Sequence, residues 1–192
     1  MKQGANVERA PGIIVMECIV RPGPSVVWAR NAAATCVSND ISGNQGDGIY
    51  FSFVHGHLAN NTIRKNPGTG ILVDRSGGGT ITGNKSWENA VGFWDVSPEG
   101  EGGQLAIYNN HFDNTENVEG FAPNTWEIAE RPGPNIAGAP NLRGNYWALP
   151  NMKGFSRTHP DADRDGFCDL ACEINGGFPA GVPTLITSRF GL

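Results

Sequence analysis

Three glycines recur every 22 residues, and each begins a short apolar run. They are Gly48, Gly70 and Gly92, followed by Ile-Tyr-Phe, Ile-Leu-Val and Phe-Trp. Pairs of asparagines run in phase with these glycines, at positions 39 and 44, 61 and 66, 84 and 89, and 110 and 114. A fixed period in the low twenties is typical of a solenoid, in which each repeat buries its apolar face only against neighbouring repeats.

The repeat indicates strands and not helices. Its apolar stretches are short, are separated by Gly, Asn, Asp and Ser, and are rich in β-branched or aromatic residues, as in Ile49–Val54 and Thr80–Thr82. No stretch shows the i, i+3, i+4, i+7 spacing of an amphipathic helix over three turns. Leucine-rich repeats have a similar length, but this chain has few leucines and no helical half in each unit.

We therefore predict an all-β fold, a right-handed parallel β-helix solenoid of about five 22-residue coils with an irregular C-terminal tail. Stacked asparagines would hydrogen-bond to one another and to turn backbone, and glycine would supply corners with positive φ. The coils are expected over residues 1–122 and a capping tail over 123–192. The predicted inward positions are Ile41, Ile63 and Ile81, with Ile49, Ile71 and Phe93 on the neighbouring strand.

Charge and hydropathy exclude several classes of protein. The net charge is −5, and the basic pair Arg64-Lys65 is too small to be a nucleic-acid-binding face. No stretch of eighteen apolar residues exists, so no membrane span is expected, and no signal peptide is visible at the N-terminus.

The four cysteines allow two disulfides. Cys18 and Cys36 are separated by about one short coil, and Cys168 and Cys172 lie within one loop. Two disulfides would suit an extracellular protein, whereas four thiols would suit a cytoplasmic one. The tail favours the extracellular alternative.

The tail contains alternating aspartates followed by glycine, Asp-x-Asp-x-Asp-Gly, and then a fourth aspartate. Such a loop directs several oxygens at one point, which suits Ca²⁺ with its six to eight oxygen ligands. It is not an EF-hand, because the twelfth position is Cys172 and no amphipathic helices flank it. The predicted calcium ligands are Asp161, Asp163, Asp165, the backbone carbonyl of Phe167, and Asp169.

The repeat Asn-x-Ile-x-x-Asn, together with an ending of Asn124-Thr-Trp126, Gly144–Trp147 and the Asp/Gly loop, resembles the NosD-like right-handed parallel β-helix proteins. This group is also described as carbohydrate-binding and sugar-hydrolase β-helix domains. The resemblance implies a secreted or cell-surface location. It implies no single activity, because members resemble copper-site maturation factors, carbohydrate-binding modules, surface-layer proteins and polysaccharide-cleaving enzymes.

Asp74 and Asp95 are candidate catalytic residues. Placed on adjacent coils, they would lie about 5 Å apart, as the two carboxylates of a retaining glycosidase do. Their register slips by one residue, however, and outward aspartates on a β-helix are usually solvated. A polysaccharide lyase or hydrolase is therefore an alternative to a non-catalytic protein.

His55-Gly-His57 places two imidazoles on one coil, and imidazole suits copper or zinc. His111 and His159 lie elsewhere in the sequence, and the three methionines are scattered, so no soft Cu(I) cluster is evident. A copper-handling protein that uses His55 and His57 is a further alternative.

Aromatic residues on consecutive coils favour carbohydrate binding. Tyr50, Trp87 and Trp94 are the candidates, because outward rings would form a stacking platform for sugars. The later aromatics Trp126, Tyr146 and Trp147 are expected to cap the last coil instead. No N-terminal cap is recognisable, so end-to-end self-association into a layer or filament is also possible.

The sequence thus favours a non-catalytic extracellular or cell-surface module that is stabilised by calcium. Its expected partner is a polysaccharide or cell-surface glycan, or another copy of the chain in a surface layer.

Overall fold

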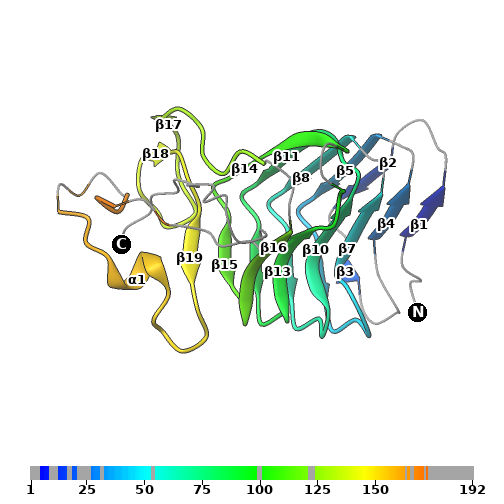
Figure 1. Cartoon of the computed structure of the whole chain (residues 1–192), viewed down its shortest axis with the longest axis horizontal. Coiled ribbons are helices and arrows are strands. Elements are labelled where there is room, and N and C mark those ends of the chain that lie inside the picture. The colour runs from blue at the N-terminus through cyan, green and yellow to red at the C-terminus, as the bar shows by residue number, and fades with distance from the viewer. Residues whose placement is uncertain are drawn as a thin grey trace.

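The computed structural model describes a chain made almost entirely of short parallel strands (Figure 1). It describes residues 5–8, 13–16, 19–20, 27–30, 33–52, 55–98, 101–120, 124–162, 164, 167–170 and 172.

Three parallel sheets run along the molecule, and each coil contributes one strand to each sheet, except that the last coil meets sheet B only through an isolated bridge between Ala106 and Thr125. The coils stack along the long axis from the N-terminal to the C-terminal side (Figure 1). Sheet A contains β1 (Ala5–Glu8), β4 (Val27–Arg30), β7 (Ile49–Ser52), β10 (Thr69–Asp74), β13 (Val91–Asp95) and β16 (Glu116–Gly120). Sheet B contains β2 (Ile13–Met16), β5 (Ala33–Val37), β8 (His55–Ala59), β11 (Gly77–Thr82) and β14 (Gly103–Tyr108). Sheet C contains β3 (Ile19–Val20), β6 (Asp40–Ser42), β9 (Thr62–Arg64), β12 (Lys85–Trp87), β15 (His111–Asp113) and β19 (Tyr146–Ala148).

The remaining elements belong to the C-terminal part. β17 (Arg131–Pro132) and β18 (Asn141–Leu142) form an antiparallel pair, and α1 (Phe155–Thr158) is a single helical turn. This arrangement confirms the predicted parallel β-helix.

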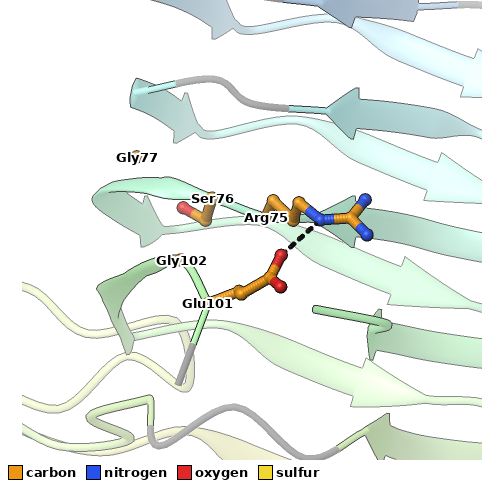
Figure 2. Close-up of a pocket in the computed structure, with 5 residues that line it drawn as sticks. All are labelled: Arg75, Ser76, Gly77, Glu101 and Gly102. Carbon is orange, nitrogen blue, oxygen red and sulfur yellow. Dashed lines mark hydrogen bonds and ion pairs between the residues drawn. The ribbon is translucent and has the colours of Figure 1, made fainter. Parts of the chain in front are cut away.

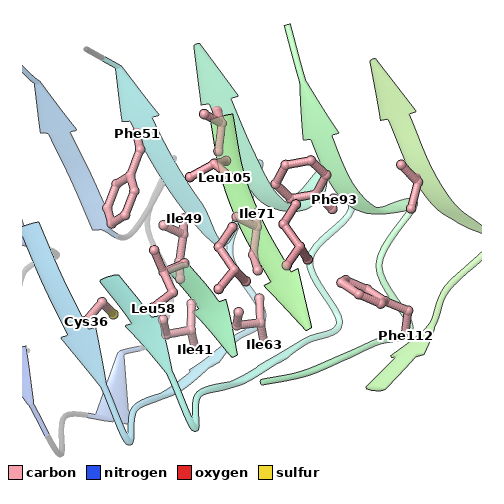
Figure 3. Close-up of a cluster of buried hydrophobic side chains, with 14 of the residues drawn as sticks. Cys36, Ile41, Ile49, Phe51, Leu58, Ile63, Ile71, Phe93, Leu105 and Phe112 are labelled. Carbon is pink, nitrogen blue, oxygen red and sulfur yellow. The ribbon is translucent and has the colours of Figure 1, made fainter. Parts of the chain in front are cut away.

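Side chains alternate between the interior and the surface along each strand, as strand geometry requires. In sheet A, Ile49, Ile71 and Phe93 pair in register and are buried in the interior (Figure 3). Ile41 and Ile63 form the corresponding stack in sheet C. Ile81 is buried as predicted, but it stacks on Leu58 in sheet B, and Ser86 takes the place above Ile63.

Two columns of buried asparagines line the corners on either side of sheet C. In each column, Oδ1 of one asparagine accepts from both the backbone N–H and the Nδ2 of the asparagine one coil earlier. The first column contains Asn39, Asn61, Asn84, Asn110 and Asn145, and the second contains Asn44, Asn66, Asn89 and Asn114, ending on Asn117.

A residue in the left-handed region stands immediately before most of these asparagines. Before the first column these are Ser38 (φ 58°), Asn60, Gly83 and Asn109, and before the second they are Gly43, Lys65 and Glu88. The left-handed residue turns the chain, and the asparagine satisfies the backbone groups that the turn leaves buried.

The glycines of the 22-residue repeat have a different role from the one predicted. Gly70 is not among the described residues with positive φ. A Cβ on Gly70 would instead lie 2.7 Å from Ser86 Oγ and 2.8 Å from the carbonyl oxygen of Gly92. Gly48 and Gly92 are similarly crowded by neighbouring coils. Glycine is required at these positions because adjacent coils approach too closely for a side chain.

The C-terminal part closes the last coil with aromatic rings. Trp126 packs edge-on against Phe93 with ring centroids 5.4 Å apart, and Trp147 stacks on Phe112 at 5.0 Å. Both tryptophans belong to the same core as the coils, as expected for a cap. At the other end, β1, β2 and β3 are the last of the described strands in their sheets. End-to-end self-association stays a prediction.

Asn84→Ala tests the asparagine columns. Nδ2 of Asn84 donates to the carbonyl oxygens of Leu58 and Thr82 and to Asn110 Oδ1, and its Oδ1 accepts from Asn61. Because the variant leaves these buried groups unpaired, we expect a loss of about 3 kcal/mol in the free energy of unfolding. Urea denaturation measures it.

The matched control is Asn151→Ala, since Asn151 is exposed and its side chain accepts one hydrogen bond, from the backbone of Lys153. It should cost less than about 1 kcal/mol. Equal losses for the two variants would contradict the role assigned to the buried column.

Candidate functional site: the outer face of sheet A

Tyr50, Leu72 and Trp94 form a column on the outer face of sheet A. They are paired in register on β7, β10 and β13, and each lies between two inward-facing neighbours. All three are half-buried. Strands in a sheet are about 4.8 Å apart, so Tyr50 and Trp94 are separated by roughly 10 Å along the column. The structure therefore brings together two of the three predicted carbohydrate-binding residues, with Leu72 between them.

A polar cluster that contains Asp74, Arg75 and Glu101 lies at the carboxyl end of β10. Figure 2 shows Arg75 and Glu101 of this cluster. Asp74 accepts hydrogen bonds from Tyr50 Oη (3.5 Å) and Ser52 Oγ (3.3 Å). Arg75 donates from Nη1 to Asp74 (3.1 Å) and from Nε to Glu101 (2.7 Å). The hydrogen bond to Glu101 raises the pKa of Arg75, so its guanidinium remains charged. Two carboxylates thus hold one guanidinium beside an aromatic ring.

An open pocket of about 360 Å³ adjoins the polar cluster, at the corner where sheet A passes into sheet B. It is lined by Arg75, Ser76, Gly77, Glu101 and Gly102. In Figure 2, a dashed line marks the hydrogen bond that joins two of these residues, Arg75 and Glu101. Its volume lies in the range of small-molecule sites.

The sequence did not indicate a main role for Arg75 in this site, and it gave no signal for Glu101. Glu101 comes from residues 96–102, the longer connection between β13 and β14, where the 22-residue period is lost. Leu72 could have been found, because positions 50, 72 and 94 follow the period.

The candidate catalytic carboxylates do not form the stacked pair that their sequence positions suggested. The register pairs Asp95 with Val73, one residue before Asp74. Asp95 therefore points inward and is buried, whereas Asp74 faces outward. Asp95 accepts hydrogen bonds from the backbone N–H of Ser97 and from Asn124 Nδ2, both at 3.0 Å. These bonds give Asp95 a structural role, joining the last coils to the tail.

Trp87 lies on the outer face of sheet C, away from Tyr50 and Trp94. Arg64 and Lys65 approach its ring, with Arg64 Cζ 5.5 Å and Lys65 Nζ 5.8 Å from the ring centroid. The predicted aromatic set is therefore divided between two faces, and the Trp87 ring is partly covered by cations.

His55 and His57 both project outward from β8 in sheet B and are exposed. His55 Nδ1 lies 3.0 Å from the carbonyl oxygen of Gly77, and His57 Nδ1 contacts Thr80 Oγ1. A carbonyl only accepts hydrogen bonds, so Nδ1 of His55 is the donor in this contact, which leaves Nε2 as the available ligand atom of a neutral imidazole.

Across the described ranges, no three His, Cys, Asp or Glu residues gather closely enough to hold a metal ion. The other two histidines lie apart from His55 and His57. His111 is on β15 in sheet C, where burial lowers its pKa, and His159 stacks on Phe155 in the tail.

Two of the predicted calcium ligands, Asp163 and Asp165, lie outside the described residues. The described part of the loop is closed on itself: the backbone N–H of Asp169 donates to the Pro160 carbonyl (3.0 Å), and Asp169 Oδ2 accepts from the Ala162 N–H (3.2 Å). Phe167 is buried in a small cluster with Tyr146 and Ala148 of β19. The loop is thus packed against the last strand of sheet C, and calcium binding stays a prediction.

No disulfide joins any two of the described cysteines, which are Cys36, Cys168 and Cys172. Cys36 is buried in the core, where its sulfur accepts from Asn39 Nδ2 at 3.2 Å. Cys18 lies outside the described residues, so the predicted pairing with Cys36 stays a prediction.

The protein is a parallel β-helix protein, because successive coils build three parallel sheets and two columns of asparagines run inside it. The chain belongs to the family described as periplasmic copper-binding protein (NosD), whose family model matches residues 2–152. The comparisons found no matching curated protein and no matching solved structure. Within the described part of the chain, no helix has the length and apolar character needed to cross a membrane.

Proposed function

We propose that this protein is a non-catalytic periplasmic or cell-surface module that binds an extended neutral glycan along the outer face of sheet A. The column of Tyr50, Leu72 and Trp94 carries the proposal. Its two aromatic side chains stand two coils apart on a straight sheet face, which suits stacking against alternate sugar rings of an extended chain. The family description supports the location.

The polar cluster would supply hydrogen bonds to sugar hydroxyls. Asp74 and Glu101 accept, and Arg75 donates, so together they match the mixed donor and acceptor character of a hydroxyl. Glu119 extends the column beyond Trp94 and adds a further negative charge. Asp74, Glu101 and Glu119 outnumber Arg75 and the exposed Arg30, which is in register with Ser52, and this balance favours a neutral sugar over an acidic one.

The positions of Asp74 and Asp95 on opposite faces of sheet A remove the geometric support for a lyase or hydrolase that uses this pair. Glycan binding does not require a pair of carboxylates, because the aromatic column would bind sugars by stacking.

We also propose that Ca²⁺ binds the Asp161–Asp169 loop and stabilises the C-terminal cap. Four aspartates in this loop repel one another without a cation. Because Phe167 packs against Tyr146 and Ala148, ordering of the loop would be coupled to the packing of β19.

A second candidate function is copper binding at His55 and His57. The family description names copper, and the two exposed imidazoles project from one strand, with the His55 Nδ1 held by the Gly77 carbonyl so that Nε2 is the available nitrogen. Imidazole nitrogen is a suitable copper ligand. Two protein ligands leave coordination positions open, which suits transient delivery of the ion.

Trp94→Ala and Tyr50→Ala test glycan binding. Each removes one stacking ring, and we expect the dissociation constant for a neutral polysaccharide to rise about tenfold. Affinity electrophoresis against neutral β-glucans, xylans and mannans would identify a ligand, and calorimetry would measure its affinity.

Trp87→Ala is the matched control, since Trp87 lies on another sheet. The proposal would be contradicted if Trp94→Ala and Trp87→Ala weakened glycan binding equally, or if no neutral glycan bound.

Copper binding is tested by titrating the protein with Cu(I) in competition with a chromophoric chelator. The double variant His55→Ala/His57→Ala should lose one bound copper per chain, because both proposed ligands are removed. His159→Ala, in the tail, should bind as the unmodified protein does. Full retention of copper by the double variant would exclude this site.

Calcium binding is tested by thermal unfolding with excess calcium and with chelator. At a calcium concentration about a hundred times the dissociation constant, binding adds about 2.7 kcal/mol. In a chain of this size that corresponds to a rise in Tm of roughly 5–10 °C.

Asp163→Asn/Asp165→Asn should have the same Tm in both conditions. If the Tm of the unmodified protein is the same with calcium and with chelator, the loop is ordinary acidic surface.

A further inference from the structure

The outer face of sheet C carries a group of cations around one tryptophan. Lys85 and Trp87 both project outward from β12. Arg64 pairs with Trp87 from the preceding coil, and Lys65 follows Arg64 at the corner. We call Arg64, Lys65, Lys85 and Trp87 the Trp87 cluster.

The Trp87 ring holds two of these cations in place. Arg64 Cζ and Lys65 Nζ lie within 6 Å of the ring centroid, at 5.5 and 5.8 Å. A cation at this distance is attracted by the negative face of the ring. A sugar ring stacked on Trp87 would have to displace them. Trp87 is therefore better suited to orient charged side chains than to bind a sugar directly.

The cations retain charge for a ligand. The pair between Lys65 and Glu88 measures 3.5 Å, but its side chains are 55% and 51% exposed. Such an exposed ion pair is weak and yields readily to a better partner. Lys85 is exposed, and none of the ion pairs found among the described residues involves it.

Neighbouring groups modify this charge. Asp40 lies 3.1 Å from Arg64 and neutralises part of its charge. His111 follows Lys85 on the next coil, and burial favours its neutral form. On β15, Asp113 is paired with Arg157 of α1 at 3.6 Å. With Asp40 beside Arg64 and Glu88 beside Lys65, the three cations of the Trp87 cluster keep one net positive charge on a protein whose net charge is −5.

We propose that the Trp87 cluster binds the carboxylates of an acidic glycan, with Lys65 and Lys85 as contacts and Trp87 as a positioning residue. Lys85 is in register with Thr62, so Lys65 and Lys85 lie on neighbouring coils but three residues apart along the chain, on the order of 10 Å. At that spacing the two lysines would contact carboxylates on different sugars of one extended chain. A nucleic acid would require a larger basic face. An anionic membrane would require a longer run of basic residues.

This proposal does not depend on the one for sheet A, because the two sites lie on different sheets and favour different ligands, a neutral glycan on sheet A and an acidic glycan on sheet C. Trp94→Ala should therefore leave binding of the acidic glycan unchanged. A failure of one site can be recognised while the other still binds its own ligand.

Calorimetry with a short oligoglucuronate at low ionic strength tests the site. We expect binding that weakens as salt is added, because the contacts are exposed charges. The same oligosaccharide with its carboxylates methyl-esterified should bind at least about tenfold more weakly. Equal binding of the ester and the acid, or no binding of the acid, would overturn the proposal.

Lys85→Gln should weaken binding about fivefold, whereas Lys153→Gln, the same charge change at an exposed lysine of the tail, should change it less than about twofold. Similar losses for these two variants would mean that net charge alone attracts the ligand, which would overturn the site.

Trp87→Leu should weaken binding while leaving its salt dependence intact, since the cations remain. Trp87→Phe should recover part of the affinity, because a phenyl ring also attracts cations, though less than an indole. If Trp87→Phe binds no better than Trp87→Leu, Trp87 is not a positioning residue.

Discussion

The rest of the structure depends on the hydrogen bonds of the buried asparagines. Each coil turns sharply on either side of sheet C, and those turns place backbone N–H and carbonyl groups inside the molecule. Asn84 donates to carbonyls of its own and the preceding coil and is paired with the asparagines before and after it. Such side chains link three successive coils at one point. With the corners fixed in this way, every outward residue acquires a defined neighbour one coil away.

Fixed registration explains why the two outer faces differ in chemistry. On sheet A the register aligns Tyr50, Leu72 and Trp94. The carboxylates around Arg75 lie beside this column. On sheet C the register places Trp87 between Arg64 and Asp113. The interior is mainly apolar along the described coils, and isoleucine and phenylalanine supply most of its largest fully buried side chains. The fold therefore sets the spacing of candidate ligand contacts, while the outward residue at each position sets their character.

The repeat predicted the coils, the asparagine columns and most of the core, because each depends on residues one period apart. It could not assign Ile81 to sheet B, since nothing in the spacing distinguishes one inward stack from another. It placed Asp74 and Asp95 together although one residue of register puts them on opposite faces. Glu101 was missed because residues 96–102 lie outside the period. What the sequence could not supply was the register at strand ends and the path of the longer connection.

Among the residues that the structure describes, the corner between sheets A and B has no asparagine column. Its connection changes length between coils: it spans residues 75–76 after β10 but 96–102 after β13. Lengthening at this corner leaves the hydrogen bonds of the other two corners untouched. Evolution can therefore insert or delete residues there at little cost in stability, and the same freedom is open to protein engineering. Grafted loops at this corner would stand beside the aromatic column, which makes the scaffold suitable for selecting new binding specificities.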